Sequence, residues 1–481
     1  MAYRFGNRHQ IGMFPQSIEE YVKDEDPVRA YDAFVEALDF GTLGIVIAPH
    51  KVGNPEYDPK TMMKLLVYGY SYGIKSSRKL EREVHHNISF IWLLGGMKPD
   101  HKTIAEFRRN NKEALKKVLR QCVGVCIKFK LIDGNILFTD GTKIRANAAR
   151  HRTHDKAYYE KLLANIDQRI DRLLGECEAI DRQEEEEGSY VSMDKELAGA
   201  KNLKEKVKEV LETFEKTGKE RINQTDPDCA VMRSVQGSHA AYNVQGVVDD
   251  KHGLIVNAEA VSDVTDINQF AIQTDKANEV LGKSCDTACA DAGYANTDEL
   301  EKIDKQGIKV VVPSQRQALH EEESPFAKSH FQYNKEQDLY VCPEGHRLNY
   351  RGTDGKNGKR HYRITDGKIC QGCKHFGRCT SAKKGRKIVR LHNEEVKEKL
   401  EAQYEKEKEI YDRRKTRIEH PFGHIKRNLK TDAFMLRGRD GVQAETSLLA
   451  TCFNLARMMT ILGISTLIEK LTMLNGITAV I

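Results

Sequence analysis

The order of the apolar segments between residues 135 and 313 is the feature that most constrains the fold. Five segments have the length and composition of β-strands, and only KHG separates the second from the third, which is typical of a hairpin. A helix near Asp266–Leu281 lies between the third and the fourth. The five are Asn135–Ile144, Ala240–Asp250, Leu254–Ser262, the small-residue stretch before Asp291, and Lys309–Pro313. This order predicts an α/β core with a mixed sheet.

Residues 1–130 predict a helical N-terminal domain. The Asp–Pro pairs at 26–27 and 58–59 indicate N-caps that are followed by a proline in the first helical turn. Thr103 lies three residues before Glu106, which predicts a capping box. Compact helical modules of this kind commonly bind DNA, and a plain helical scaffold fits the pattern equally well.

The first part of the core, residues 131–313, contains a long helical insert at 151–225. Apolar residues in both halves of the insert recur at steps of three and four, which is a heptad seam. They are Leu163, Ile166, Ile170, Leu173, Cys177 and Ile180 in the first half, and Leu203, Val207, Val210 and Phe214 in the second. The acidic stretch EEEEGSY at 184–190 separates the halves. We expect an antiparallel helical hairpin without chemistry of its own.

Four of the eleven cysteines lie in the polar, glycine-rich segment 314–386, before the second part of the core at 387–481. The four are Cys342, Cys370, Cys373 and Cys379. Four thiolates from a small insert suit tetrahedral Zn²⁺, and His346 and His375 could replace one of them. Because the segment has little apolar content, we expect the metal to supply its folding energy. The alternative is a set of free thiols.

Positive charge is concentrated in one stretch of the chain. Residues 380–430 carry 16 Lys and Arg against 9 Asp and Glu, a net charge of +7, whereas the whole chain has a net charge of +6. A basic face on a near-neutral body indicates a polyanion partner, most simply nucleic acid. For Glu394–Glu409, where the charges alternate in sign, a solvated helix is the better interpretation.

Three carboxylates are candidates for a catalytic centre. Asp140 and Asp291 each end an apolar strand and are followed within two residues by a glycine, and Glu419 lies on a predicted helix. Converging carboxylates repel one another unless a divalent cation lies between them, and hard oxygen ligands suit Mg²⁺ or Mn²⁺. Two such ions can promote phosphodiester cleavage. A single aspartate at a strand end is more often a cap or turn residue, so the hypothesis depends on all three.

The blocks around these residues resemble those of known proteins. FTDGTKIRANA around Asp140, ADAGYAN around Asp291, and the stretch from Tyr411 through Glu419 to Lys426 resemble the catalytic blocks of bacterial DDE transposases. The resemblance is to the insertion sequence 4-like superfamily, insertion sequence 1182 type. YGIKSSRKLEREVHHNISFIWLLGG and PDHKTIAEFRR resemble the helical N-terminal domain of these enzymes. The resemblance covers nearly the whole chain.

The resemblance implies an RNase H-like core with Asp140 on its first strand, Asp291 after its fourth strand and Glu419 on a following helix. It implies double-stranded DNA partners, namely terminal inverted repeats and target DNA. Water would cleave the DNA and a 3′-hydroxyl would transfer the strand. Pairing of two ends implies a homodimer on DNA.

The third block also contains candidate phosphate contacts. The family pattern is Y-x₂-R-x₃-E-x₆-K. The spacing from Tyr411 to Arg414 and the spacing from Glu419 to Lys426 match it. The spacing from Arg414 to Glu419 is one residue longer than in the pattern. Lys415 stands at the expected arginine position. The DNA-binding candidates are Tyr411, Arg414, Lys415, Lys426, Lys143 and Arg145. The last three could equally be ordinary surface residues.

The sequence therefore predicts a metal-dependent DNA transposase. The alternatives are an RNase H-like nuclease that cuts without joining, and a non-catalytic, zinc-containing DNA-binding protein. The first residues, MAYRFGNRHQ, do not resemble a signal peptide, and no stretch has the pattern of a membrane span. We expect a protein of the bacterial cytoplasm, associated with the nucleoid.

Overall fold

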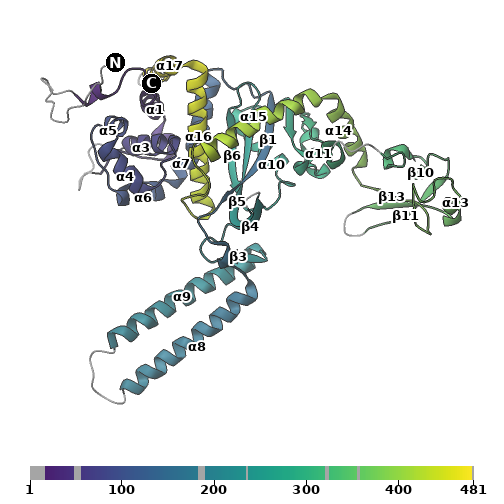
Figure 1. The fold of residues 1–481 in the computed structure, drawn as a ribbon, viewed down its shortest axis with the longest axis horizontal. Coiled ribbons are helices and arrows are strands. Elements are labelled where there is room, and N and C mark those ends of the chain that lie inside the picture. The colour runs from purple at the N-terminus through teal and green to yellow at the C-terminus, as the bar shows by residue number, and fades with distance from the viewer. Residues whose placement is uncertain are drawn as a thin grey trace, which may run out of the picture. The chain divides into compact units, whose positions relative to one another are not determined.

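The chain is a mixed α/β protein with antiparallel and parallel strand pairs (Figure 1). The structure is a computed structural model, and it describes residues 17–47, 56–181, 190–234, 237–319, 324–354 and 358–478. The chain forms two compact units. Unit 1 contains Met1–Asp266, Gln273–Cys285 and Lys415–Ile481, and unit 2 contains Ile267–Ile272 and Asp286–Arg414.

The described residues ahead of the first strand are helical, as predicted. The helices are α1 (Pro27–Glu36), α2 (Phe40–Leu43), α3 (Pro59–Ser71), α4 (Ser77–His86), α5 (Ile88–Leu93), α6 (His101–Asn110) and α7 (Lys112–Lys128), after a 3-10 turn at Ile18–Tyr21. The two predicted N-caps are confirmed: Asp26 accepts the N–H of Val28 at 2.9 Å, and Asp58 accepts the N–H of Thr61 at 2.9 Å.

The predicted capping box at Thr103 is wrong. The N-cap of α6 is Asp100, whose carboxylate accepts the N–H of Thr103 at 2.7 Å. An aspartate three residues before the threonine competes for the same backbone donors, and the helix therefore begins earlier than the threonine suggests.

The sheet of unit 1 is built around one long strand. β5 (Gly237–Asp249) pairs antiparallel with β1 (Ile136–Arg145), with β4 (Ala230–Ser234) and with β6 (Ile255–Val261). The predicted hairpin is confirmed as β5 and β6. In the β1–β5 register Asp140 lies opposite Gly246.

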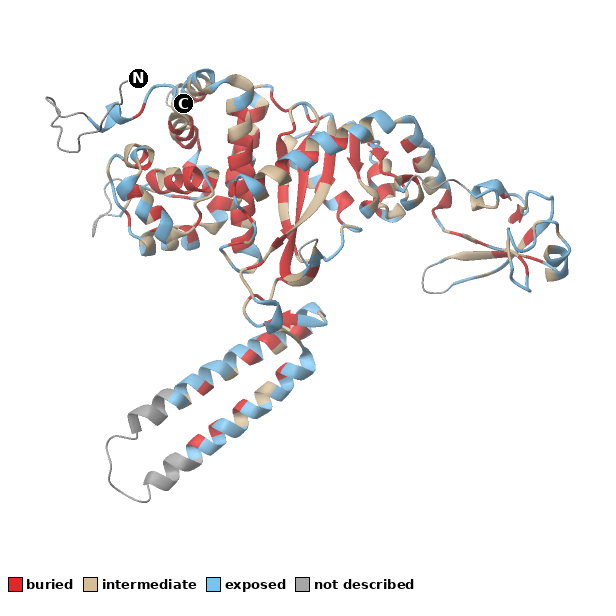
Figure 2. Ribbon diagram, viewed as in Figure 1, coloured by how far each residue is buried: buried red, intermediate tan, exposed pale blue. Residues whose placement is uncertain are grey.

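Helix α16 (Gly438–Leu462) forms the core of unit 1, and most of its residues are buried (Figure 2). It packs against α7 and α3 and against β6. Its amide side chains satisfy backbone groups of β6: Asn454 exchanges two hydrogen bonds of 2.8 Å with Ile255, and Gln443 bonds the N–H of Ala260 and the carbonyl of Ala258 at 2.8 Å. The helix thus satisfies backbone groups that β5 leaves unpaired, which explains why polar residues interrupt an apolar segment.

Within the described ranges, no single helix is long and apolar enough to span a membrane. Helix α16 and α17 (Ile464–Thr478) together meet the length and composition test, but they are bent by 114° and α16 is mostly buried in protein.

The helical insert is an antiparallel hairpin, as predicted (Figure 1). It consists of α8 (Lys156–Asp181) and α9 (Tyr190–Thr217), and its base is closed by the antiparallel strands β2 (Thr153–Asp155) and β3 (Arg221–Asn223). Its core includes Ile166, Ile170, Val207, Val210 and Phe214.

The predicted seam of the hairpin is wrong at one position. Leu203 is 37% exposed, and Ala200 occupies the buried position one turn earlier. Leu203 lies four residues before Val207 and Ala200 lies seven before it, so both spacings fit one helix face and the sequence pattern alone could not choose between them. The predicted seam residues Cys177 and Ile180, and most of the acidic stretch, lie outside the residues whose side chains the structure describes.

Unit 2 contains a parallel strand pair, β7 (Thr287–Ala290) and β8 (Lys309–Val311), which α11 (Thr297–Lys305) connects. Helix α14 (Glu394–Lys406) packs on β8, and Gln403 donates to the carbonyl of Val310 at 2.7 Å. Two helices, α10 (Phe270–Leu281) and α15 (Lys408–Arg427), have residues in both units. Helix α15 continues through Pro421 without a new start.

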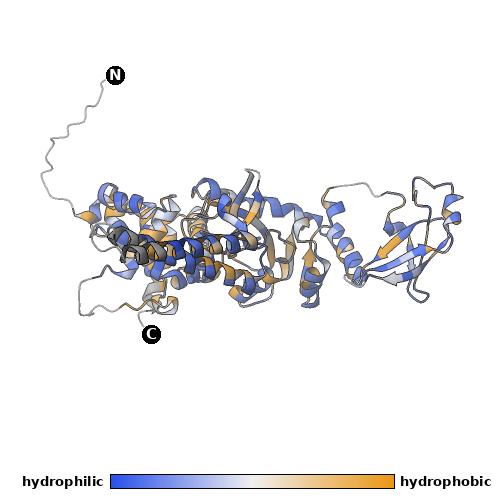
Figure 3. Cartoon of the chain, turned by 90° about the horizontal axis from the view of Figure 1, so that it is seen from below, coloured by the Kyte–Doolittle hydropathy of each residue, from blue (hydrophilic) through white to orange (hydrophobic). Residues whose placement is uncertain are grey.

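The cysteine-rich segment folds into a five-stranded antiparallel sheet in the order β13-β12-β11-β10-β9. The strands are β9 (Gln332–Asn334), β10 (Leu339–Val341), β11 (Arg347–Thr353), β12 (Arg360–Ile364) and β13 (Lys387–Arg390). Figure 3 shows apolar stretches within otherwise hydrophilic strands of this domain. Its core includes the buried residues Tyr340, Tyr362 and Ile388. The segment thus forms an apolar core although most of its residues are polar. Its sheet includes β13 and therefore extends past the expected boundary at residue 386.

Candidate active site

Asp140 lies near the middle of β1, half-buried, and its Oδ1 accepts the N–H of Gly141 at 2.7 Å. Opposite it, Gly246 leaves room for an aromatic ring of α15: a Cβ atom at Gly246 would lie 2.9 Å from Cζ of Phe422. The close approach of backbone and ring brings α15 against the strand pair that carries Asp140.

The apolar face of α15 explains this contact. Ile418, Phe422 and Ile425 are spaced by four and three residues, so they share one helix face. Pro421, Phe422 and Ile425 line a small apolar cavity together with side chains of β1, β5 and β6. Glu419, next to the buried Ile418, lies on the exposed side of the helix.

Lys426, two turns after Glu419, interacts with Asp140. Burial lowers the pKa of Lys426 below its ordinary value, and the negative charges of Asp140 and Asp432 oppose that shift. The structure therefore brings the predicted phosphate-contact residue Lys426 to the first predicted catalytic carboxylate. Glu419 lies on the same helix, seven residues earlier.

A further carboxylate of unit 1, Asp266, lies over Gly141, on the face of the sheet opposite to that of Asp140. Its Oδ1 accepts hydrogen bonds from Asn243 Nδ2 at 2.7 Å and from Gln245 Nε2 at 2.6 Å, and all three side chains crowd the space over Gly141. The sequence predicted that the next helix begins near Asp266, but α10 begins at Phe270, so Asp266 belongs to the loop before it.

The sequence did contain a signal for this polar cluster. Asn243 and Gln245 alternate inside an otherwise apolar strand, and both are buried, with exposures of 1% and 0%. Buried amides need partners, so the pair predicts a polar group over that face of the sheet. The loop that supplies Asp266 could not be identified without the fold.

In unit 2, Asp291 ends β7 and accepts the N–H of Gly293 at 2.8 Å. Tyr411 of α15 is its neighbour: burial raises the pKa of Tyr411, Arg414 opposes the shift, and Asp291 adds to it. The Arg414 guanidinium lies 5.5 Å from the centre of the Tyr411 ring and is mostly buried. Three of the predicted site residues therefore form one cluster within this unit.

Two regions of the chain match models of transposase families. Residues 16–110 match the model described as "Transposase domain (DUF772)", and residues 341–459 match the model "Transposase DDE domain". No curated protein matches the chain. The two matches indicate a DNA transposase of the DDE type.

The second match covers much of the candidate site. It contains Tyr411, Arg414, Glu419 and Lys426 together with all four clustered cysteines, whereas Asp140 and Asp291 lie outside both matched regions. The matches therefore support the transposase assignment independently of the two aspartates.

The remaining predicted DNA contacts have different surroundings. Lys415 is exposed on α15. Lys143 is half-buried, with its Nζ 3.4 Å from the carbonyl of Arg233. Arg145 forms a parallel bridge with Ala433 and accepts the N–H of Phe434 at 2.9 Å, so its backbone holds the segment that follows α15.

The four clustered cysteines line one cavity, together with His346 and His375. Backbone amides already donate to two of the sulfurs: His346 N–H to Cys342 at 3.3 Å and Arg386 N–H to Cys370 at 3.5 Å. Among the described residues, however, no group of three or more His, Cys, Asp or Glu side chains is arranged to hold a metal ion. The four thiols and two imidazoles are donors that suit zinc. In this structure they line the same cavity without converging on one point.

Proposed function

We propose that the protein is a metal-dependent transposase that cleaves transposon ends and joins them to target DNA. Asp140, Asp291 and Glu419 are the proposed metal ligands, for Mg²⁺ or Mn²⁺, in an RNase H-like core of the insertion sequence 4-like superfamily, insertion sequence 1182 type. The close packing of α15 on β1–β5, which puts Lys426 within the electrostatic influence of Asp140, is the observation that carries the proposal.

Divalent cations bound there would activate the attacking oxygen and stabilise the leaving oxygen of the phosphodiester. The carboxylates hold these cations, and α15 fixes Glu419 and Lys426 on a helix that is anchored to the sheet. Lys426 neutralises a phosphate of the bound strand, and Tyr411 and Arg414 position the strand beside Asp291. A rigid helix is a more precise support for such groups than a loop.

The proposal assigns the N-terminal helices, residues 1–130, to DNA binding, with the hairpin 151–225 and the cysteine-rich segment 314–386 as inserts in the core 131–481. Two protein copies bind the two inverted repeats, and sedimentation of the complex with end DNA tests this stoichiometry. A substrate of this kind places the enzyme on the nucleoid, in the bacterial cytoplasm.

The test compares Asp140→Asn with Asp133→Asn, an exposed aspartate that precedes the same strand. We expect Asp140→Asn to lower Mg²⁺-dependent cleavage of end DNA by at least about a hundredfold, because even outer-sphere substitutions at metal sites cost about 10- to 100-fold. DNA binding and the control variant should be unaffected. Wild-type cleavage by Asp140→Asn would refute the assignment.

A second assay separates the proposed function from its rivals. With pre-cleaved ends, a transposase joins the 3′-hydroxyl to target DNA, a nuclease leaves the ends unjoined, and a binding protein neither cuts nor joins. Joining that requires both Mg²⁺ and Glu419 is the result expected here.

We also propose that Cys342, Cys370, Cys373 and Cys379 bind a structural Zn²⁺, because the four thiols line one cavity. Elemental analysis of the purified wild type should give one zinc per chain, and Cys373→Ser should lose it. Cys229→Ser, at a buried cysteine of unit 1, should keep it. A metal-free wild type would overturn this assignment without affecting the catalytic one.

A further inference from the structure

One face of the cysteine-rich sheet carries positive charge. On β12, Tyr362 and Ile364 point into the apolar core, so the alternating residues His361 and Arg363 lie on the opposite face. Lys387 of β13 lies directly opposite Arg363 in the register and shares that face. Like charges at directly opposed positions destabilise a sheet, so the fold alone does not account for this pair.

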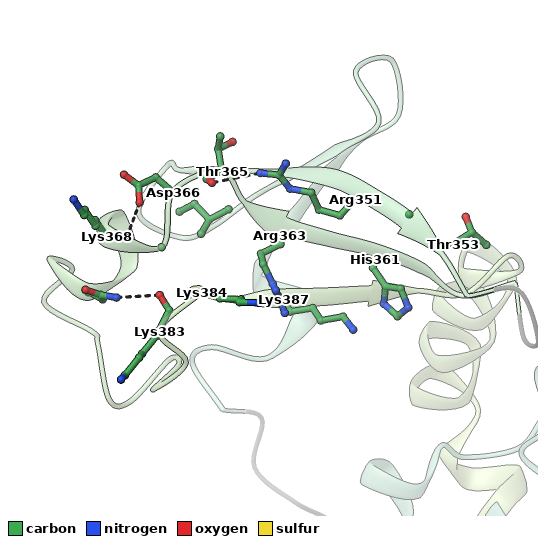
Figure 4. Close-up of a pocket in the computed structure, with 14 residues that line it drawn as sticks. Arg351, Thr353, His361, Arg363, Thr365, Asp366, Lys368, Lys383, Lys384 and Lys387 are labelled. Atoms are coloured by element: carbon green, nitrogen blue, oxygen red, sulfur yellow. Dashed lines mark hydrogen bonds between the residues drawn. The ribbon is translucent and has the colours of Figure 1, made fainter.

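Four more cations surround the pair in a cleft of about 690 Å³ (Figure 4). The six are Arg351, Arg363, Lys368, Lys383, Lys384 and Lys387. Asp366 is the one carboxylate among the described lining residues, and its Oδ1 already accepts the N–H of Lys368 at 2.9 Å. Ile364 is the only large apolar side chain among those residues, which makes the cleft unlike the mostly apolar sites that bind small molecules.

The cations of this cleft lack the carboxylate partners that neighbouring surface cations have. Within the described part of the chain, none of the six forms an ion pair, whereas outside the cleft Lys374 pairs with Glu344 at 3.2 Å and Lys335 with Glu395 at 3.2 Å. The cleft therefore presents uncompensated positive charge.

The loop that carries Lys383 and Lys384 is held in place by backbone contacts. Gln371 donates to the carbonyl of Lys383 at 2.9 Å, and the backbone of Gly367 packs directly against the same residues. The charge is thus presented by three strands, a short helix and a fixed loop, rather than by one tail.

We propose that this cleft binds the phosphodiester backbone of duplex DNA, as a contact surface separate from the carboxylate site. The inference rests on the proposed DNA substrate. Six unpaired cations with one carboxylate fit a polyanion, and phosphates between Arg363 and Lys387 would relieve their repulsion. The contact reads no bases, so it adds affinity to transposon ends and to unrelated DNA alike.

The experiment measures binding of the full chain to a fluorescent duplex of arbitrary sequence as a function of salt. The test variant is Arg363→Gln, Lys384→Gln, Lys387→Gln, which keeps much of each side-chain stem and removes three charges. Its matched control is Lys335→Gln, Lys374→Gln, Arg378→Gln, in the same domain but outside the cleft. Each lost phosphate contact lowers the slope of log K against log salt by about 0.9.

We expect the slope for the test variant to fall by roughly 2 to 3 and the affinity at about 0.15 M salt to fall roughly 10- to 100-fold, with the control close to wild type. The thermal unfolding midpoint of the test variant should equal or exceed that of the wild type, because the variant removes the repulsion between Arg363 and Lys387. An unchanged slope, or an equal loss in the control, would overturn this inference while cleavage by the wild type still supports the catalytic proposal. Failure of the wild type to bind any DNA would instead refute the proposed function.

Discussion

At the scale of single residues, buried charge in unit 1 has a measurable consequence. Glu445 of α16 is fully buried, and its Oε2 accepts the N–H groups of Met435 and Leu436 at 2.8 and 3.1 Å. Burial raises the pKa of Glu445, although these amides and the nearby Lys75 and Arg108 oppose the shift. The carboxylate fixes the segment that follows α15, close to the proposed phosphate-binding lysine.

This shift predicts how stability depends on pH. A carboxyl group whose pKa is raised in the folded state stabilises the fold below its ordinary pKa, and that stabilisation is lost as pH rises through the folded-state value. Glu445→Gln removes the titration and keeps an oxygen acceptor. We expect the free energy of unfolding of this variant, measured by urea denaturation, to rise relative to that of the wild type as pH increases from about 4 to about 7. A constant difference across this range would contradict the prediction.

At the scale of elements, the packing of α15 on the sheet determines where Glu419 and Lys426 lie. The helix approaches closely because Gly246 has no side chain beneath Phe422. Gly423 lies on α15 itself, and a Cβ atom there would meet nothing within 4 Å. Two glycines near one contact therefore have different physical roles.

We predict that Gly246→Ala overpacks the interface, lowers the free energy of unfolding by about 1 to 3 kcal/mol, and reduces DNA cleavage because α15 must shift. Phe422→Leu removes ring atoms at the clash, so the double variant should be more stable than the sum of the two changes predicts. Gly423→Ala is the matched control and should stabilise the helix by about 0.5 to 1 kcal/mol. Urea denaturation and cleavage rates check all four proteins.

At the scale of the whole molecule, unit 1 contains an insert with a core of its own. The residues that pack between α8 and α9 form a separate apolar cluster, and the β2–β3 pair closes its base. Tyr159 donates to the carbonyl of Ile222 at 3.0 Å, where the hairpin joins this pair. The hairpin therefore adds little to the stability of the sheet around β5.

We predict that the hairpin can be removed. Deleting Lys156–Glu220 and joining Asp155 to Arg221 through Asn-Gly makes a two-residue β-turn between residues that are already paired, and Ile222→Thr avoids an exposed apolar side chain. The shortened chain should unfold within a few degrees of the wild type and still cleave DNA in Mg²⁺. Retained folding with lost cleavage would show that the hairpin takes part in the reaction.

The sequence by itself determined the local structure of this protein. Helix caps at Asp26 and Asp58, the β5–β6 hairpin and the helical hairpin follow from contacts between neighbours in the chain, which sequence spacing records directly. The sequence also indicated the candidate carboxylates and the basic character of α15, but it wrongly placed Asp140 at the end of its strand, because β1 continues to Arg145. Its errors at Thr103 and Leu203 arose where two nearby residues satisfied the same local rule.

Only the tertiary structure decided which distant residues meet. Asp266 joins Asn243 and Gln245 over Gly141, Asn454 completes the bonding of β6, and Lys387 faces Arg363, each across a separation that no local pattern encodes. Such contacts depend on how buried polar groups find partners once the apolar faces have packed. For that reason the candidate carboxylates could be named from the sequence, while the polar cluster over Gly141 and the basic cleft required the fold.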